Sequence, residues 1–360
     1  MRKILVGTAS LSLGALCLLP ATAAFAVPTS FGNQADEPTQ LFSGFSLRVA
    51  TIQANLTGDT ADGLEEKLMG GTNSQAAQVA DSLSAADADV VVLTNMDAEQ
   101  GAVDTFKNLY LNNIADDRTD VDYPYSYLAV GSKGLQSGAD LNADGVIGSA
   151  EDAWGQGAFE EQGSIVVLSK YPVDEGKITA VSKLKWQQVE NDQLHHTGLS
   201  GVLAASIPVM STGLWDIPID YRGQQVHVVA TQTQTEPEGR NREFSQARHA
   251  DELKVISDYV AGKDYVHTDS DGHAEGLGGE KFVVAGALDL QDSSADRLEP
   301  FLQGLAREDA LNDGGSYLVP DSSWEVTGQG RIEQREPLLE EAVPNDVEEP
   351  GSLIWTDIEF

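Results

Sequence analysis

Continuous apolar runs alternate along the chain with segments of helical spacing. Residues 45–56 and 89–93 have the profile of buried strands, and residues 75–86 between them carry apolar side chains at helical spacing. The same patterns predict further strands at 164–169, 225–231, 281–286 and 353–358, and a helix at 247–260. Strands that are apolar on both faces and alternate with helices indicate a layered α/β fold in which helices cover the sheets.

The first 26 residues have the pattern of a secretory signal. Arg2 and Lys3 give a positive start, residues 4–20 form an apolar run, and Ala24-Phe25-Ala26 is a small-x-small cleavage site. A membrane anchor is the alternative, but Gly, Thr and Ser interrupt the apolar run and no second long apolar stretch follows. We therefore expect cleavage after Ala26, secretion, and no stable insertion into a membrane.

The remainder of the chain divides into a leader and one domain. Residues 27–44 are rich in Pro, Ser, Gly, Asn and Gln without an apolar period, which predicts a flexible leader. Residues 45–360 show no internal repeat and no second composition regime, so we expect one domain and a monomer. The acidic stretch 333–349 is expected to be a solvated surface loop.

Charge and cysteine content exclude several functions. The only cysteine is Cys17, inside the signal, so the mature chain has no disulfide, no Cys nucleophile and no thiolate metal site. The formal net charge is −35, and cleavage removes two basic and no acidic residues, which leaves −37. Because nucleic-acid binding normally requires clustered Lys and Arg, we do not expect nucleic acid as a partner.

Several separated segments together resemble secreted members of the endonuclease/exonuclease/phosphatase family, in order and spacing over residues 45–360. They are Leu47-Arg48-Val49-Ala50-Thr51, Ala88-Asp89-Val90-Val91-Val92-Leu93 with Asp97, Trp154-Gly155-Gln156-Gly157, Val166-Val167-Leu168-Ser169-Lys170-Tyr171-Pro172, Trp215-Asp216-Ile217-Pro218, Arg240-Asn241, and Phe282-Val283-Val284-Ala285-Gly286. The resemblance implies a four-layer α/β/β/α sandwich of two mixed sheets, with its site where strand ends from both sheets meet. It also implies phosphoester hydrolysis with Mg²⁺ or a similar hard cation.

The positions where the family carries its catalytic groups are substituted in this chain. The family's amide, metal-binding Glu and catalytic-site His correspond here to Gln53, Asn95 and Gln232, and its Gly-Asp-x-Asn reads Gly286-Ala287-Leu288-Asp289. The late Asp-Tyr element corresponds to Ser316-Tyr317, and the final Ser-Asp-His to Glu349-Pro350-Gly351. Loss of one general acid or base typically lowers the rate by ~10² to 10⁴. Because several catalytic groups are replaced together here, we do not expect the family's mechanism to operate in this chain.

Other ionisable residues are candidates for a rebuilt site. Asp97, Asp289 and Asp292 could form a displaced cation site, and His249 or the pair His195-His196 could carry a proton. The alternative for each is a solvated surface acid or an ordinary surface histidine, and we favour it because repair requires three residues to converge by new routes.

One ion-binding motif is complete. Residues 140–151 match the twelve-residue calcium loop, with Gly145 at the turn position and ligands predicted at Asp140, Asn142, Asp144, Val146 (through its carbonyl) and Glu151. An acidic turn without an ion is the alternative, since residues 134–139 are not expected to be helical. We interpret the loop as a structural calcium site in an insertion at 134–153.

The sequence therefore predicts a secreted, non-catalytic relative of metal-dependent phosphoesterases that acts as a binding or envelope-associated module. Its ligand, small or polymeric, is not identified by the sequence. The alternative is an active secreted nuclease or phosphodiesterase with a relocated site, and only this alternative requires Mg²⁺.

Overall fold

The structure is a computed structural model. It describes residues 45–112, 121–199, 201–234, 242–270, 276–289, 311–313, 315–334 and 350–359. The expected signal (1–26), the leader (27–44), Asp292 and most of the acidic stretch 333–349 lie outside these ranges. Residues 44–360 form one compact unit.

Two six-stranded sheets make up the centre of this unit. The strands of the first sheet, in order across it, are β11 (Glu325–Ile332), β12 (Leu353–Glu359), β1 (Ser46–Leu56), β2 (Val90–Met96), β4 (Ser164–Ser169) and β3 (Tyr125–Ala129). Those of the second are β5 (Thr179–Val181), β6 (Gly213–Tyr221), β7 (Gln224–Gln232), β8 (Phe282–Ala287), β10 (Ser316–Pro320) and β9 (Leu311–Asp313).

Each sheet has one parallel pair at its centre. β1 runs parallel to β2 with Val49 opposite Val90, and β7 runs parallel to β8 with Val228 opposite Val283. The other neighbouring strands are antiparallel. Because parallel strands end at the same edge, the carboxyl ends of β1 and β2 lie together, as do those of β7 and β8.

The two sheets pack face to face through alternating apolar positions. Leu47 and Val49 of β1 lie in the core shared with the second sheet, which contributes Val226 and Val228 of β7. Residues of β1 on the opposite face, such as Ile52, belong to a different core beneath the helices. This period of two is the pattern expected of strands buried on both faces.

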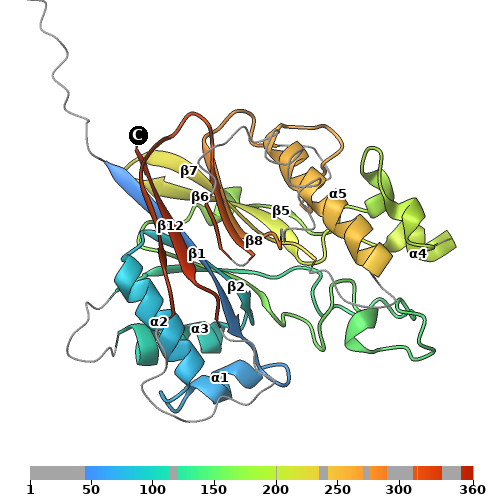
Figure 1. Ribbon diagram of the computed structural model, residues 1–360, viewed down its shortest axis with the longest axis horizontal. Coiled ribbons are helices and arrows are strands. Elements are labelled where there is room, and N and C mark those ends of the chain that lie inside the picture. The colour runs from blue at the N-terminus through green and yellow to red at the C-terminus, as the bar shows by residue number, and fades with distance from the viewer. Residues whose placement is uncertain are drawn as a thin grey trace, which may run out of the picture. The chain divides into compact units, whose positions relative to one another are not determined.

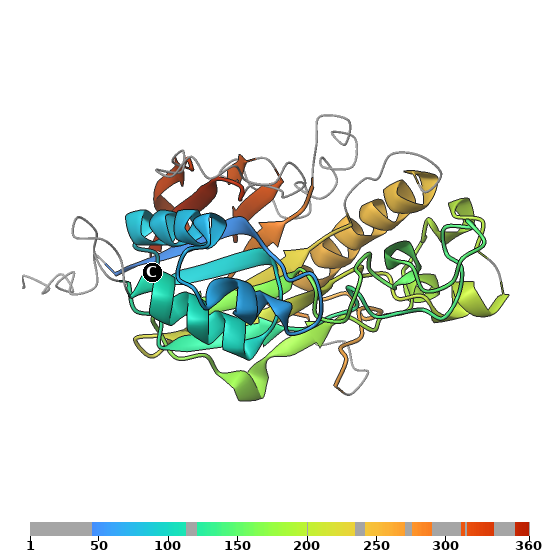
Figure 2. The ribbon, with the colours of Figure 1, turned by 90° about the horizontal axis from the view of Figure 1, so that it is seen from below.

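Helices cover the two outer faces (Figures 1 and 2). The longer helical elements are α1 (Gly63–Leu68), α2 (Ser74–Ala86), α3 (Gln100–Phe106), the π-helical turn η1 (Lys107–Leu111), α4 (Gly201–Ser206) and α5 (Arg242–Val260). The single 3₁₀ turns are η2 (Ala150–Asp152), η3 (Glu175–Lys177), η4 (Trp186–Gln188) and η5 (Leu194–His196). Within the described residues, no helix combines the length and the apolar character needed to cross a membrane.

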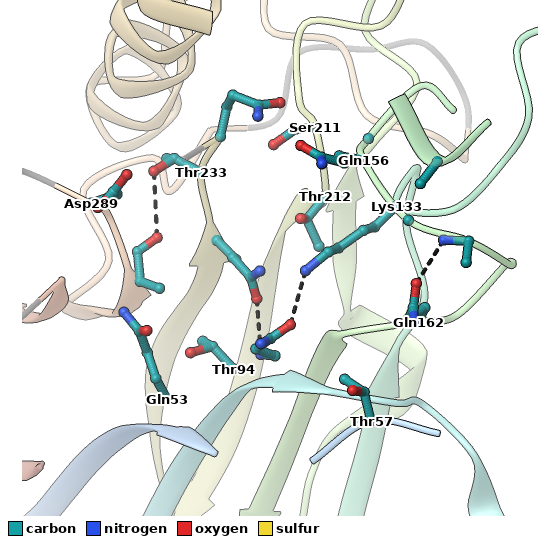
Figure 3. Close-up of a pocket in the computed structure, with 18 residues that line it drawn as sticks. Gln53, Thr57, Thr94, Lys133, Gln156, Gln162, Ser211, Thr212, Thr233 and Asp289 are labelled. Carbon is teal, nitrogen blue, oxygen red and sulfur yellow. Dashed lines mark hydrogen bonds between the residues drawn. The ribbon is translucent and has the colours of Figure 1, made fainter. Parts of the chain in front are cut away.

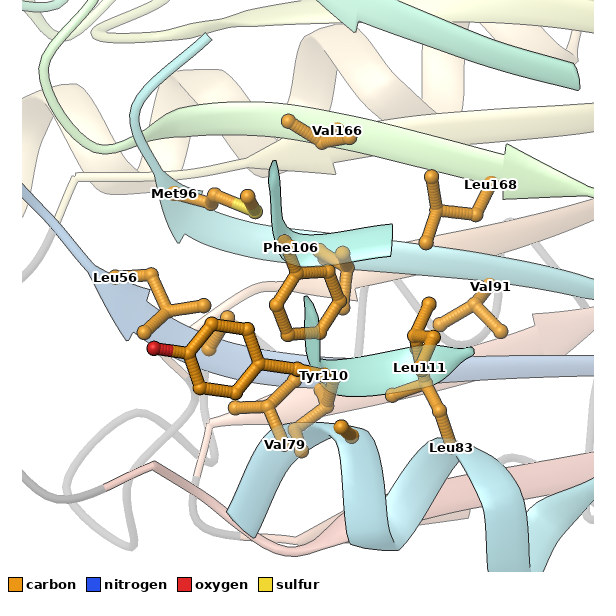
Figure 4. Close-up of a cluster of buried hydrophobic side chains, with 14 of the residues drawn as sticks. Leu56, Val79, Leu83, Val91, Met96, Phe106, Tyr110, Leu111, Val166 and Leu168 are labelled. Atoms are coloured by element: carbon orange, nitrogen blue, oxygen red, sulfur yellow. The ribbon is translucent and has the colours of Figure 1, made fainter. Parts of the chain in front are cut away.

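Each outer core is built from a helix face and a sheet face. On the first sheet, Leu83 of α2 and Phe106 of α3 pack with Val91 and Leu168 of the strands (Figure 4). On the second, Ile256 of α5 belongs to the corresponding core. The order helix, sheet, sheet, helix confirms the predicted four-layer α/β/β/α sandwich.

The predicted elements agree with the structure to within a few residues, with one larger difference. The last long helix begins at Arg242, five residues before the predicted start at 247. Its first turns bury polar side chains, Ser245 and then Arg248 and His249, in place of apolar ones. The apolar spacing of the sequence therefore does not indicate the beginning of α5.

Candidate functional site

The carboxyl ends of β1, β2, β7 and β8 surround a cavity of about 400 Å³. All five pocket positions named from the sequence line it, namely Gln53, Asn95, Gln232, Ala287 and Asp289. They come from both sheets, and Figure 3 shows Gln53 and Asp289 on one side of the pocket.

Asn95 lines this pocket from a β-bulge. The register of β2 shifts between Thr94 and Met96 against β4, and that of β1 shifts between Gln53 and Leu56 against β2. Asn95 and Asn55 both adopt the left-handed conformation, with φ of 52°. Asn tolerates this conformation better than most residues, and bulges are common beside functional sites because they redirect side chains.

Hydrogen bonds tie Asn95 to three neighbours. Its backbone N–H donates to Oε1 of Gln232 over 3.0 Å, which joins the two sheets. Its side-chain amide donates to Oδ1 of Asn55 over 2.8 Å. It also accepts from Nζ of Lys133 over 3.0 Å (Figure 3). Asn95, at the position that corresponds to a metal-binding Glu in the family, is therefore hydrogen-bonded to the amides of Asn55 and Gln232 and to the ammonium of Lys133.

The rest of the lining is polar and almost neutral. Six side-chain amides line the cavity: Gln53, Asn95, Gln156, Gln162, Gln232 and Gln234. Five hydroxyl side chains line it as well: Thr57, Thr94, Ser211, Thr212 and Thr233. Among the described lining residues, Lys133 is the only cation and Asp289 is the only carboxylate. Such a surface suits a ligand rich in hydrogen-bonding groups.

Lys133 was not anticipated from the sequence. It lies in the irregular segment between β3 and β4 and reaches toward the strand ends. The backbone around it is fixed, since Ser132 N–H donates to the Thr212 carbonyl and Gly155 N–H to the Ser132 carbonyl. A Cβ at Gly155 would lie 1.8 Å from the Ser211 carbonyl, so only glycine permits this approach.

Buried charges on α5 hold the pocket wall from behind. Glu252 accepts hydrogen bonds at Oε1 from the backbone and hydroxyl of Ser211, both 2.6 Å, and at Oε2 from Gln234 N–H, 2.6 Å. One turn earlier, Arg248 donates to the carbonyls of Val209, Pro208, Met210 and Trp154. Burial lowers the pKa of Arg248 to about 10.

Asp97 does not join a displaced cation site. It is 3% exposed, and its carboxylate accepts hydrogen bonds from Gly58 N–H and Gly163 N–H, each 2.7 Å. The expectation of a solvated surface acid is therefore wrong, because this carboxylate fastens two loops. Burial raises the pKa of Asp97, and the two hydrogen bonds and the nearby charge of Lys133 offset only part of that effect.

The candidate histidines differ in burial. His249 is fully buried, and its Nε2 lies 2.7 Å from the Leu288 carbonyl, so the expectation of a surface histidine is wrong here. It supports the turn that follows β8. His195 and His196 are exposed, with ring centroids 3.9 Å apart, as expected of surface residues.

The two most distant elements assigned from the family also lie beside the pocket. Ser316 pairs with Ala287 at the end of β8. Gly351 N–H donates to the Gln53 carbonyl over 2.9 Å. The substituted positions therefore lie at one end of the two sheets, although Glu349 is outside the described residues.

The loop 140–151 is closed by hydrogen bonds to its own backbone. Asp140 accepts from Asp144 N–H at 3.1 Å and Gly145 N–H at 2.9 Å, and Asp144 accepts from Val146 N–H at 2.7 Å. Asn142 Oδ1 also accepts from Asp144 N–H, at 3.0 Å. Glu151 is exposed in η2, and no helix precedes the loop.

Asp152, next to the predicted calcium ligands, is the carboxylate that joins the two ends of this loop. It is fully buried and accepts from Leu141 N–H at 2.8 Å, from Gly148 N–H at 2.9 Å, and from the backbone and hydroxyl of Ser149 at 3.0 and 2.9 Å. Burial alone would raise the pKa of Asp152, but these hydrogen bonds outweigh it and hold the pKa below its usual value.

The described lining of the pocket does not offer the donor set that a hard divalent cation requires. Such ions prefer several oxygen ligands including carboxylates, and in the described lining only Asp289 supplies one. The side-chain oxygen of Asn95 already accepts from the Lys133 ammonium. Across the described ranges, no group of three or more His, Cys, Asp or Glu side chains could hold a metal ion.

No family model and no curated protein matches this chain. Solved structures with a similar fold include a mutant Staphylococcus aureus beta toxin with bound magnesium ions, which is 15% identical with a TM-score of 0.49 over 88% of this chain and 99% of that one. Sphingomyelinase C from Streptomyces griseocarneus is 18% identical, with a TM-score of 0.48 over 87% and 99%. An endonuclease/exonuclease/phosphatase from Beutenbergia cavernae is 14% identical, with a TM-score of 0.48 over 88% and 72%. At these identities the likeness says nothing of the pocket residues.

Proposed function

We propose that this protein is a non-catalytic binding module, whose pocket at the strand ends holds a polar ligand without hydrolysing phosphoesters. The observation that carries the proposal is the contact of 3.0 Å between Lys133 Nζ and Asn95 Oδ1 in a pocket lined by amides and hydroxyls. Hydrolysis of a phosphoester needs charge neutralisation and a proton carrier at the reacting atoms. The amides of Gln53, Asn95 and Gln232 supply neither, because an amide is uncharged and does not act as a general acid or base near neutral pH.

A phosphodiesterase assay tests this proposal. The purified chain without residues 1–26 is incubated with DNA, RNA and a chromogenic phosphodiester, in Mg²⁺, Mn²⁺, Ca²⁺ or chelator. We expect no turnover above the buffer background. Chelator-sensitive turnover that Asp289→Ala abolishes would establish the alternative, an active enzyme with a relocated site. Asp122→Ala is the matched control, since Asp122 is an exposed aspartate outside the pocket.

We also propose that the protein is secreted, on the strength of the signal pattern in residues 1–26. Expression of the full chain in a secreting host should yield a mature protein in the medium that starts at Val27. An N-terminus at Met1 on the recovered protein would contradict this.

Calcium binding by the loop 140–151 is a further part of the proposal. The turns at Asp140 and Asp144 already give the loop a fixed course, and the complete motif supports binding of one ion. Calcium at millimolar concentration should raise the Tm, and Glu151→Ala should remove that increase. A Tm that is unchanged well above millimolar calcium would contradict the calcium proposal and leave the pocket proposal intact.

A further inference from the structure

The ammonium of Lys133 has the position and surroundings of a fixed cation within the pocket. It contacts Oδ1 of Asn95, and its charge acts on the buried carboxylate of Asp97. The surrounding protein carries a large excess of negative charge, with 57 acidic and 22 basic residues. Lys133 therefore gives the described lining of the pocket a positive charge, although the molecule as a whole is strongly negative.

The chain leaves room specifically for this contact. A Cβ at Gly163 would lie 2.3 Å from Oδ1 of Asn95 and 2.7 Å from Nζ of Lys133. Gly163 also has a φ of +53°, a conformation that L side chains rarely adopt, and its N–H donates to Asp97. Backbone geometry and space both favour glycine here, and its absence of a side chain allows the ammonium to reach Asn95.

A charged ammonium beside Asn95 disfavours a divalent cation at the same place. Two like charges a few ångströms apart repel each other, and the repulsion is stronger in a partly buried site than in water. The ammonium instead offers N–H donors and a positive charge to an anion. Charge-assisted hydrogen bonds of this kind are roughly twice as strong as those between neutral groups.

Asp289 limits what kind of anion the pocket accepts. It lies across the pocket from Lys133 in Figure 3 and is the only carboxylate of the described lining. A second negative charge on the ligand would face this carboxylate, whereas a neutral or cationic group would be tolerated there. The pocket therefore suits a ligand with one anionic end better than a polyanion such as nucleic acid.

We propose that Lys133 is a built-in cation that binds a single oxyanion of the ligand, a carboxylate or a phosphate, without any metal. This inference rests on the proposed binding function and names the chemistry of its ligand. Lys133 supplies the charge, and Asn95 positions the ammonium.

The test is an NMR titration of the chain labelled with ¹³C-lysine, in chelator and at constant ionic strength. Sodium phosphate and sodium acetate are the two probes, and Lys133→Gln assigns the resonance. We expect a saturable shift of the Lys133 signal with half-saturation on the order of 1–10 mM for at least one probe. A response to phosphate alone identifies a phosphate-bearing ligand, and a response to acetate alone a carboxylate.

Two variants decide whether the shift belongs to this site. Asn95→Asp places a carboxylate beside the ammonium and should weaken binding at least about tenfold. Lys183→Gln removes the same charge from the exposed surface and should leave the Lys133 shift unchanged. No saturable shift with either probe, or an equal response in Asn95→Asp, would overturn the inference. Because the titration requires no turnover, it fails or succeeds independently of the phosphodiesterase assay.

Discussion

At the scale of single residues, Asp152 shows how a carboxylate can organise an acidic loop. Its four hydrogen bonds join Leu141 to Gly148 and Ser149, so the first and last turns of the loop are held through one buried side chain. Asp140 and Asp144 only stabilise turns between their near neighbours. The described contacts of the insertion therefore depend more on Asp152 than on the predicted calcium ligands.

Asp152→Ala should lower the free energy of unfolding by about 1–3 kcal/mol at pH 7, because it leaves buried N–H groups without an acceptor. The measurement is urea denaturation in chelator. Glu151→Ala is the matched control and should have little effect there, since Glu151 is exposed. Equal losses in both variants would contradict the role assigned to Asp152.

The same carboxylate should give the loop a pH dependence in the acidic range. The pKa of Asp152 is lowered in the folded state, so its contribution is complete above the ordinary carboxyl pKa of about 4 and is lost as the pH falls through the folded value. The stability difference between the wild-type chain and Asp152→Asn should therefore shrink below about pH 4. A difference that grows on acidification would contradict this sign.

At the scale of elements, α5 both covers the second sheet and fixes the pocket. Its apolar residues, such as Ile256, pack on the sheet, while Arg248 and Glu252 reach the loops around Ser211 and Gln234. Both charged side chains are almost fully buried. Their hydrogen bonds to backbone groups compensate the cost of burying charge.

Glu252→Gln should lower the free energy of unfolding by about 2 kcal/mol or more. One of the two backbone N–H groups that donate to Glu252, those of Ser211 and Gln234, would then face the N–H₂ group of the new side chain. It should also weaken binding in the pocket, since Ser211 and Gln234 line it. Urea denaturation and the phosphate titration measure the two effects. Glu243→Gln, on the exposed first turn of α5, should change neither by a comparable amount.

Apolar patterning predicted β1, β2, β4, β7, β8 and β12, but it predicted neither the other six strands of the two sheets nor the whole pocket. Runs such as 164–169 have the length and composition of a strand buried on both faces. Asn95 and Gln232, which come just after the predicted strands 89–93 and 225–231, lie at one end of the sheets. Lys133 lies in an irregular segment, 38 positions from Asn95, and meets it only through tertiary contacts. The buried polar residues of α5 could not be predicted from apolar spacing either, because they are not apolar.

At the scale of the whole molecule, net charge is the dominant property. A formal charge of −35 opposes compaction through self-repulsion, and salt screens that repulsion. Raising NaCl from 10 to 150 mM in chelator should therefore raise the Tm by a few degrees. KCl should act equally, because screening does not depend on the identity of the cation. A Tm that does not change with either salt would contradict this account.

We propose that the Lys133 ammonium takes the place of a metal ion in the pocket. The most direct measurement is an anomalous difference map from a crystal of the protein soaked in Mn²⁺. We expect no anomalous peak among Gln53, Asn95 and Asp289, and a Lys133 side chain in contact with Asn95. A strong peak at that place, with Lys133 displaced, would contradict it.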